Sequence, residues 1–444
     1  MSLVLADFVE CMSAVPFPPQ PCRHRVLDAL PLGHRMSIST AGSKTICVPA
    51  PSEADYQKLI QHGPSFRSFL DAAIAKHPEL FPSAIAHGYW LHDSVRSKKL
   101  NLTTRRIKLV TTQAVYQVRP DFVLPYMTGL TDDVEKALYL RRFGVPVEAL
   151  AYVFGRDSSY WYRLYQALGR FSIVGTTVKE PGAIPVHLIA DEKHSWRLGK
   201  RVFIPTTVGA GCFLGVDIVP SAETPDLVKG YGRFRDEALY LNPNYRPETG
   251  NTDGWEPTQI ALKTLFPGIA LILCFLHTVL DIQKRCRRDK GLWKKLTGRL
   301  WHVYKAASKR HFAQRLRRLR AWANRTVKQP SIRKRLAKLK GKSKQFQVAY
   351  NYPGAARTSN MLDRLMNYQD RLLFTMQYFH GSEDSARQYL RAMALLWNFH
   401  PYGQRTIAKD PNRRSPFRDL NGVEYHENWL RNLLIAGSMN GYRQ

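Results

Sequence analysis

Three aspartates that follow or begin ordered segments are the residues of this sequence best suited to chemistry. Asp191 closes the apolar run IPVHLIAD, and Asp253 lies 62 positions later in the turn TDG, directly before a helix with Pro257 in its first turn. Carboxylates at the tips of neighbouring strands can share a divalent metal ion. Asp363, one turn into the predicted helix of TSNMLDRLMN, is the best candidate for the third carboxylate of a two-metal site. Each aspartate taken alone is more often a helix cap or a surface residue, so the hypothesis rests on their combination.

Three further residues lie close in sequence to these acids. His194 follows Asp191 by three positions and could assist at the same site, and Cys274-x-x-His277 follows the second acid. Zinc would need two more ligands at a familiar spacing, and none is present, so zinc is not expected. We predict instead that Cys274 and His277 are buried, with His277 hydrogen-bonded near the acids. Cys22, His24 and Cys47 also match no common zinc spacing.

The segments around the acids predict an α/β fold. Apolar runs that read as strands alternate with amphipathic helices, and the first three strands are consistent with an antiparallel meander. The predicted order is strands at 184–191, 201–211 and 212–220, a helix at 224–239, a helix at 257–266 and a buried strand at 270–275.

Residues 131–170 predict a helix-turn-helix. A first helix capped by Thr131 or Asp132 is followed by a second that ends at Gly155 and a third that opens on Asp157. A plain three-helix bundle is the alternative. In the helix-turn-helix interpretation, exposed residues near the start of the third helix face the DNA major groove. These residues are Arg156, Ser158, Ser159, Tyr160, Trp161 and Arg163.

The chain is strongly basic, with a net charge of +31, and the charge is concentrated in one block. Residues 284–344 hold 24 Lys and Arg against one acid, Asp289, a net charge of +23. Leucines recur there at helical spacing and Pro330 divides the block, which predicts a folded basic helical region. A solvated charged face would normally mix signs, so we predict contact with nucleic acid. The residues chosen for this contact are Arg315, Arg317, Arg318, Arg320, Arg333, Lys334 and Arg335.

The remaining sequence is less informative. A helix is expected over 56–75, a hairpin over 107–119, and two helices over 359–380 and 382–399, before a polar tail. The six cysteines are scattered without a CxxC pair, which favours a reducing compartment. The longest apolar run, Gly268 to Leu280, is too short to span a bilayer, and the first residues lack signal-peptide character. We therefore expect a cytoplasmic protein without a membrane segment.

The order Asp191, TDG with Asp253, Cys274-x-x-His277 and TSNMLD with Asp363 resembles the RNase H-like acidic-triad (DDE/DDD) transposases. The similarity is greatest to the Mutator-like group, which includes bacterial insertion-sequence transposases. In that group a helical insertion precedes the third acid, in a phrase similar to T-T-N-x-I-E-R-x-N. The third acid is usually glutamate there, so Asp363 departs from the pattern. The resemblance spans residues 131 to about 400.

The resemblance implies a domain order: an N-terminal region (1–125), a helix-turn-helix (126–180), an RNase H-like mixed sheet with flanking helices (181–283), a basic all-α insertion (284–345), the rest of the core (346–400) and a tail (401–444). It also implies a nucleoid-associated transposase that uses Asp191, Asp253 and Asp363 to hold two Mg²⁺ ions, with Mn²⁺ as a substitute. Its partners would be terminal inverted repeats, target DNA and further copies of itself, as a homodimer or higher oligomer. A domesticated, non-catalytic DNA-binding protein and a metal-dependent nuclease without strand transfer are the alternatives.

Overall fold

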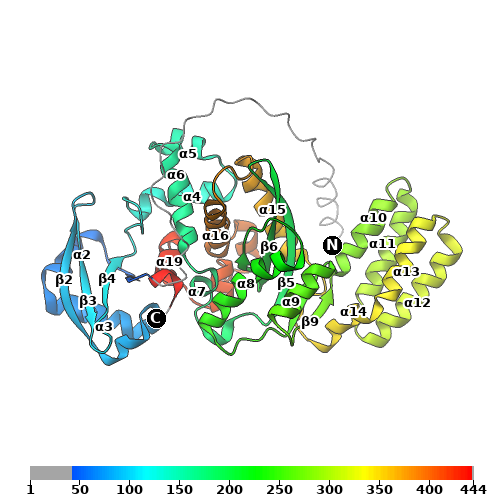
Figure 1. Cartoon of the computed structure of the whole chain (residues 1–444), viewed down its shortest axis with the longest axis horizontal. Helices are drawn as coiled ribbons and strands as arrows, with labels where there is room; N and C mark the ends of the chain where they lie inside the picture. Colours follow the sequence, from blue (N-terminus) through cyan, green and yellow to red (C-terminus); the bar gives the residue numbers. More distant parts are fainter. Residues whose placement is uncertain (1–42, 443–444) are drawn as a thin grey trace. The chain divides into compact units, whose positions relative to one another are not determined.

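The computed structural model describes residues 43–442, which form a mixed α/β structure (Figure 1). The predicted α/β class is confirmed. In the described range, the first sheet has the strand order β1-β4-β3-β2, with β1 parallel to β4 and the other pairs antiparallel. Its strands are β1 (Thr45–Val48), β2 (Tyr89–Ser97), β3 (Leu102–Leu109) and β4 (Val115–Pro120).

The hairpin predicted over 107–119 is confirmed as β3 and β4, although Thr111 lies in the turn between them. The single helix expected over 56–75 is wrong in one respect. It is two helices, α2 (Glu53–Gln61) and α3 (Gly63–Lys76), because His62 between them has extended backbone dihedrals. The side chains of Ser52 and His62 accept hydrogen bonds at the starts of α2 and α3. Cys22 and His24 lie outside the described residues.

The second sheet contains Asp191 on β5, and its strand order in the described range is β7-β6-β5-β8-β9. β5, β6 and β7 pair antiparallel, which confirms the predicted meander, whereas β8 and β9 run parallel to β5. The strands are β5 (His187–Arg197), β6 (Lys200–Gly209), β7 (Cys212–Val216), β8 (Thr249–Thr252) and β9 (Ala270–Leu273).

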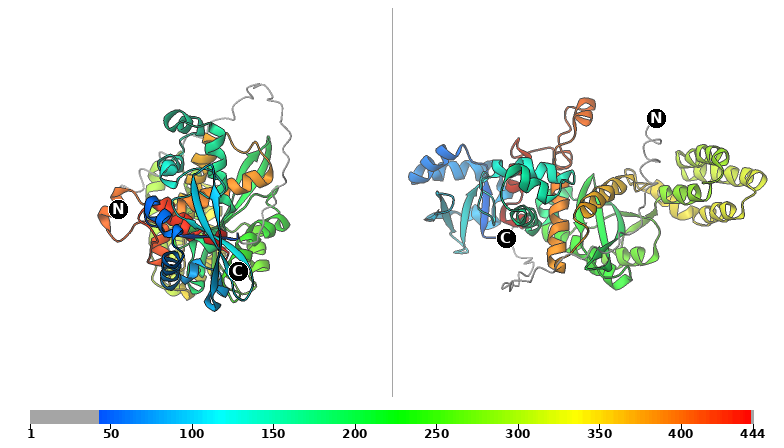
Figure 2. Two further views of the ribbon diagram at one scale, coloured as in Figure 1. Left: turned by 90° about the vertical axis from the view of Figure 1, so that its left-hand side faces the viewer. Right: turned by 90° about the horizontal axis from the view of Figure 1, so that it is seen from above.

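Helices cover both faces of this sheet (Figures 1 and 2). Because side chains alternate along β5, Leu188 and Ala190 lie on one face of the sheet. There they pack in a core that also contains Tyr231 and Leu262 of two helices. Ile189 lies in the opposite core, which contains Leu362 and other side chains of two later helices. The first pair is α8 (Thr224–Leu241) and α9 (Glu256–Leu265), and the second pair is α15 (Asn360–Thr375) and α16 (Glu383–Phe399).

The three helices predicted over 131–170 are present, and they pack into the same core as α15 and α16. They are α4 (Thr131–Arg142), α5 (Val147–Phe154) and α6 (Ser158–Ala167). Asp157 caps α6, since its side chain accepts from the Ser159 N–H. The predicted cap of α4 is wrong: Leu130 occupies that position, because the Thr131 hydroxyl instead donates to the Asp121 carbonyl at 2.7 Å. The other helices that contribute buried side chains are α7 (Ile173–Thr177), α18 (Pro416–Asn421) and α19 (Trp429–Ala436), whereas α17 (Gln404–Lys409) has none. The polar tail expected after residue 400 is wrong for α19, whose Leu430, Leu433 and Leu434 are buried.

The basic block is folded, as predicted, and it forms a helical insertion between β9 and α15 (Figure 1). Its leucines at helical spacing are buried around an apolar core of their own. Pro330 starts a new helix, which confirms the predicted division. The helices are α10 (Phe275–Arg285), α11 (Lys290–Tyr304), α12 (Lys309–Thr326), α13 (Pro330–Gly341) and α14 (Ser343–Gln347). None of the helices between residues 43 and 442 combines the length and apolar character that crossing a membrane requires.

Candidate functional site

The strand register brings Asp191 and Asp253 side by side. His187 pairs with Thr249 and Ile189 pairs with Asn251 in the parallel β5–β8 ladder, so the same register sets Asp191 opposite Asp253. β8 ends at Thr252, which leaves Asp253 in the turn that follows. The prediction that Asp191 ends its strand is wrong, because β5 continues to Arg197 by pairing with β6 beyond the end of β8.

The carboxyl of Asp191 is largely buried, with a side-chain exposure of 15%. Burial raises the pKa of Asp191 to about 7, and the neighbouring Asp253 contributes to that shift in the same direction. Its Oδ1 accepts a hydrogen bond from the Glu192 N–H at 2.9 Å. A buried carboxyl repelled by a second carboxylate is the electrostatic setting that a bound divalent cation would relieve.

Glu192 points to the opposite face of the sheet. Its Oε2 accepts hydrogen bonds from the hydroxyls of Thr258 on α9, at 2.6 Å, and Tyr231 on α8, at 3.1 Å. Burial raises the pKa of Glu192, and these two donors oppose that shift. Sequence reasoning did not single out this residue, although a second acid directly beside Asp191 in ADEK was the available signal.

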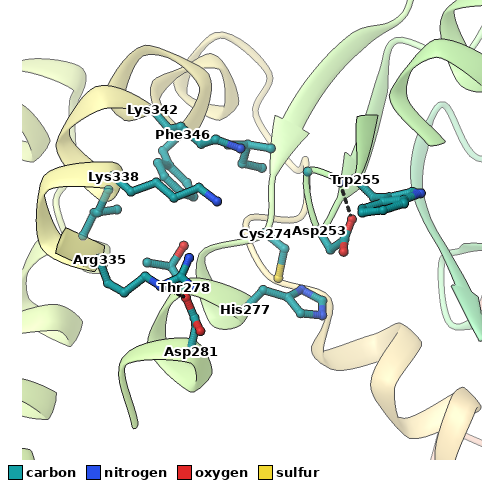
Figure 3. A pocket seen from close by; sticks show the side chains of 13 residues that line it. Asp253, Trp255, Cys274, His277, Thr278, Asp281, Arg335, Lys338, Lys342 and Phe346 are labelled. Atoms are coloured by element: carbon teal, nitrogen blue, oxygen red, sulfur yellow. Dashed lines mark hydrogen bonds and ion pairs between the residues drawn. The ribbon is translucent and has the colours of Figure 1, made fainter. Parts of the chain in front are cut away.

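Asp253 belongs to a tight turn between β8 and α9. Its Oδ1 accepts a hydrogen bond from the Trp255 N–H at 2.7 Å (Figure 3). Gly254 between them has φ +91°, a conformation that other residues rarely adopt. The Trp255 side chain is 51% exposed at the same turn. Asp253 therefore stabilises its own turn, as the turn interpretation predicted, and it also lines the cavity described below.

Asp363 lies in the first turn of α15, on the sheet face toward which Asp191 points. Both of its carboxylate oxygens are 3.2 Å from the Ser359 hydroxyl, which also lies 3.2 Å from the Cys274 sulfur. Burial raises the pKa of Asp363, and His277 opposes that shift. Two later acids of the same region are engaged in other ion pairs, because Asp370 pairs with Lys193 and Glu383 pairs with Arg387.

Cys274 and His277 mark the start of α10 and not the end of a strand. β9 stops at Leu273, Cys274 is the N-cap of α10, and His277 is the third residue of that helix. The prediction that the strand extends through Phe275 is wrong, because the chain turns into the insertion there. Cys274 is buried, as predicted, and its sulfur accepts from the Ser359 N–H at 3.2 Å.

His277 connects the acids. Its Nε2 lies 3.8 Å from Asp191 Oδ2, so it is near the acid as predicted but beyond hydrogen-bond distance. The His277 side chain is 35% exposed, so the prediction that it is buried is wrong in part. Burial by itself lowers the pKa of His277, but Cys274, Asp191 and Asp253 together raise it to about 9. A protonated imidazole beside Asp191 partly neutralises the carboxylates. His194, in contrast, is exposed and stands three residues from Asp191 on β5, so strand alternation directs it to the other face.

The donor atoms gathered here suit a hard cation. Asp191, Asp253 and Asp363 offer carboxylate oxygens, which Mg²⁺ and Mn²⁺ prefer. Within residues 43–442, no three His, Cys, Asp or Glu side chains converge closely enough to hold one ion as they stand. In this arrangement the Trp255 N–H engages Asp253 and the Ser359 hydroxyl engages Asp363.

A cavity of about 270 Å³ opens beside Asp253 (Figure 3). One wall consists of the turn at Asp253 and Gly254 together with Cys274 and His277. The opposite wall is basic and comes from α13 and the residue that follows it. Its basic side chains are Arg335, Lys338 and Lys342. Sequence reasoning selected Arg335 for DNA contact but missed the two lysines, although their spacing of three and four residues along one helix face was a usable signal.

Comparisons with known proteins add no identity. No model of a known protein family matches the chain, and no curated protein matches it. The function is therefore argued from the chain's own residues.

The residues predicted to read DNA at the start of α6 divide into two groups. Arg156, Ser159 and Arg163 are exposed, and Ser158 and Tyr160 are half-buried. Trp161 is only 2% exposed, and its indole N–H donates to the Gly155 carbonyl at 3.0 Å. The prediction that Trp161 faces DNA is wrong, because its side chain belongs to the apolar face of α6.

The basic residues predicted on α12 and α13 also divide. Arg315 donates to the His302 carbonyl at 2.7 Å, and Arg333 donates to the Val327 carbonyl at 2.5 Å, so both support the insertion. Arg335 pairs with Asp281 of α10 at 2.9 Å. The other members are exposed on the helix surfaces. These are Arg317, Arg318, Arg320 and Lys334.

Proposed function

We propose that this protein is a DNA transposase of the RNase H-like acidic-triad class, which cleaves and joins phosphodiesters with bound divalent metal ions. The observation that supports this most directly is the β5–β8 register, which aligns Asp191 with Asp253 beneath α15 and its Asp363. The mixed sheet with helices on both faces agrees with the core that the resemblance implies. The helical insertion of net charge +23 between the second and third acids agrees with it as well.

In this proposal the three aspartates hold the metal ions and His277 stabilises their charge when the ions are absent. Two bound Mg²⁺ ions, or Mn²⁺, would activate the attacking oxygen and neutralise the leaving oxygen. Water attack breaks the P–O3′ bond and leaves a 3′-hydroxyl and a 5′-phosphate. That hydroxyl can then attack a phosphodiester of the target strand, so that a new P–O bond forms while the P–O3′ bond of the target breaks and releases a target 3′-hydroxyl. The residues of the site orient the phosphate, and no covalent bond between protein and DNA is needed.

The recognition of DNA would be shared. Exposed residues at the start of α6, including Arg156, Ser159 and Arg163, would contact base edges or phosphates of the terminal repeat. The exposed arginines of α12 would bind flanking phosphates. A homodimer or higher oligomer is part of the proposal, because two transposon ends must be held together before they are joined.

The deciding experiment measures cleavage of the inverted repeats that flank the gene. Wild-type protein should nick this DNA in Mg²⁺ or Mn²⁺, and Asp191→Ala, Asp253→Ala and Asp363→Asn should each reduce the rate. The loss should exceed the ~10–100-fold typical of removing a group that only supports a ligand. Asp370→Asn and Glu383→Gln are the matched controls and should retain cleavage, because both acids are paired elsewhere. Cleavage that survives Asp253→Ala would refute the metal site.

One observation favours a second candidate, a DNA-binding protein without catalysis. The third acid is an aspartate, one methylene shorter than the glutamate of the family pattern, and both its oxygens contact the Ser359 hydroxyl. A domesticated protein of this kind would bind the terminal repeats with the same affinity in EDTA and in Mg²⁺ but would not cleave them. Joined products would exclude this candidate, and nicks without joined products would indicate a nuclease.

A further inference from the structure

The basic wall of the cavity beside Asp253 contains two lysines that pair with no carboxylate among residues 43–442. Arg335, on the same helix, is paired with Asp281, which also pairs with Arg285. Lys338 and Lys342 line the cavity but form no such ion pair, although Asp253 and Asp281 line it too. Two ammonium groups that line a solvent-open cavity beside acids, without being neutralised by them, are suited to bind an anion that enters the cavity.

The second observation is the close approach of Lys342 to the acidic turn. A Cβ placed on Gly254 would lie 3.4 Å from Lys342 Nζ and 2.9 Å from Leu273 Cδ2. Because Gly254 has no side chain, the Lys342 ammonium can lie close to the backbone of the turn that carries Asp253. In Figure 3, Lys338 and Lys342 extend toward the wall that holds Asp253, Cys274 and His277.

The third observation is that this arrangement is fixed. The Arg335–Asp281 pair joins α13 to α10. Phe346 of α14, which also lines the cavity, packs against Phe275 at 5.7 Å between ring centroids. The basic wall is therefore attached to the helix that carries His277, and the insertion and the acids form one site.

We propose that Lys338 and Lys342 are positioning residues that bind a phosphate of the DNA strand undergoing cleavage, next to the reacting phosphodiester. This inference rests on the proposed function and assigns part of the basic insertion to the active site, separate from the exposed arginines of α12. Lysine ammonium groups bind phosphate oxygens as point charges. Once cations neutralise the acidic wall, an anionic backbone can lie between the two walls.

The first test separates cleavage from binding of the terminal-repeat duplex. Lys338→Met and Lys342→Met should each lower the cleavage rate by about 10- to 100-fold, as expected for the removal of a hydrogen bond to a charged group. Their affinity for the duplex should change by less than about 3-fold, because the rest of the insertion still binds phosphates. Lys340→Met is the matched control, since Lys340 is exposed on the same helix and does not line the cavity. Equal cleavage by Lys338→Met, Lys342→Met and wild type would overturn the inference.

The second test identifies the contacted phosphate. A neutral methylphosphonate is placed, one position at a time, at the phosphates beside the mapped nick. With the methylphosphonate at the contacted position, the cleavage rate of wild type should fall as far as the rate of Lys342→Met on unmodified DNA. The methylphosphonate should lower the rate of Lys342→Met only slightly further. Additive losses at every position would contradict a direct contact and indicate that the lysine acts only on the folding of the insertion.

The third test works even if the protein does not cleave DNA. Binding of a labelled single-stranded tetranucleotide in Ca²⁺ should weaken by about 10-fold in Lys338→Met and Lys342→Met but not in Lys340→Met. If the four proteins show this order of affinities but wild type does not cleave the terminal repeats in Mg²⁺ or Mn²⁺, the transposase proposal fails and the phosphate site stands. If the tetranucleotide binds all four proteins equally, the phosphate site fails whatever the outcome of the cleavage assay.

Discussion

The side chain with the most unusual environment in the site is Asp191. It is buried, it lies opposite Asp253 in the strand register, and its pKa is raised to about 7. An ordinary aspartate ionises near pH 3.8, so between these values the folded protein binds a proton that the unfolded chain releases. Keeping Asp191 ionised at this position therefore lowers the stability of the folded protein, a trade-off that is common at functional sites.

This cost leads to a prediction for the metal-free protein. Because the folded-state pKa is raised, the stability that protonated Asp191 contributes is complete below pH ~4 and is lost as the pH rises toward 7. Asp191→Asn removes that titration, so in EDTA the variant should become more stable than wild type as the pH rises from 4 to 6.5. The difference should reach roughly 3 kcal/mol at most.

Thermal unfolding at several pH values measures this difference. Asp236→Asn is the control, because Asp236 has a side-chain exposure of 62% and lies away from the acids. Mg²⁺ should stabilise wild type and not Asp191→Asn. A stability difference that is constant with pH would contradict the raised pKa.

The sequence predicted positions best where a residue lies at a boundary between elements. Asp253 lies in a turn and Asp363 in the first turn of a helix, as the pattern predicted. Trp161 was misassigned although Trp161, Leu164, Tyr165 and Leu168 repeat at helical spacing and are all buried. The apolar stripe of α6 was the better guide, and the enrichment of aromatic residues at the helix start was misleading.

At the scale of single elements, α6 separates structural from recognition residues. Trp161→Ala should destabilise the protein by about 3–5 kcal/mol, because it leaves a cavity in the core shared with α16. Arg163→Ala should leave the melting temperature nearly unchanged, since the side chain is exposed and contacts only Ser159 of its own helix. If the first helix turn binds DNA, Arg163→Ala should weaken binding of the terminal repeat, which fluorescence anisotropy measures. A variant Trp161→Phe with normal stability and altered sequence preference would contradict this division.

A buried ion pair joins the elements on the two faces of the five-stranded sheet. Glu237 of α8 accepts from Arg391 of α16 at 2.6 Å, and also from the Ser172 hydroxyl and the Val174 N–H. Arg391 further donates to the carbonyls of Gly169 and Phe171. Glu237→Ala would leave a buried guanidinium without its counterion.

We expect Glu237→Ala to destabilise the protein by about 3–5 kcal/mol. The double variant Glu237→Met with Arg391→Met should recover part of this loss, because replacing both charges removes the uncompensated one. Denaturant unfolding of the two variants and wild type provides the comparison. If the free-energy losses of the two single changes simply add in the double variant, the two side chains stabilise the protein independently.

The elements that could not be predicted are those set by tertiary pairing. β8 has the sequence TGNT, which has no strand pattern, and it is extended because β5 and β9 pair with it on both sides. β5 continues past Asp191 into polar residues because β6 supplies an antiparallel partner. The strand β6 and the helices α8 and α9, in contrast, have strong local periodicity and were predicted to within a few residues. For the insertion, the periodicity predicted helices and a division at Pro330 without their bounds.

At the scale of the whole molecule, charge is distributed very unevenly. Residues 284–344 carry +23 of the total of +31, so the remaining 383 residues carry only +8. The insertion has its own apolar core, and a row of its exposed arginines, Arg317, Arg318 and Arg320, is on the surface of α12. A field concentrated in one helical element predicts that DNA affinity, and its dependence on salt, come from that element.

The prediction is that removing exposed charges of α12 flattens the salt dependence of DNA binding. The triple variant Arg317→Ala, Arg318→Ala and Arg320→Ala should reduce the slope of log affinity against log salt by about 0.9 for each phosphate that the variant no longer neutralises. Arg315 and Arg333 are poor choices for this test, because they donate hydrogen bonds to backbone carbonyls and their removal would also destabilise the insertion. Anisotropy titrations of one duplex between low and physiological salt give both slopes.

The matched control removes the same charge from another exposed segment. Arg405, Lys409 and Arg414 are exposed on and just after α17, so their triple alanine variant has the same net charge as the α12 variant. If DNA lies along the insertion, the control should keep the wild-type slope, since long-range charge is largely screened beyond ~8 Å at physiological salt. An equal decrease of slope in both variants would mean that binding follows net charge and not the surface of α12. The insertion would then supply charge without a defined path for the DNA.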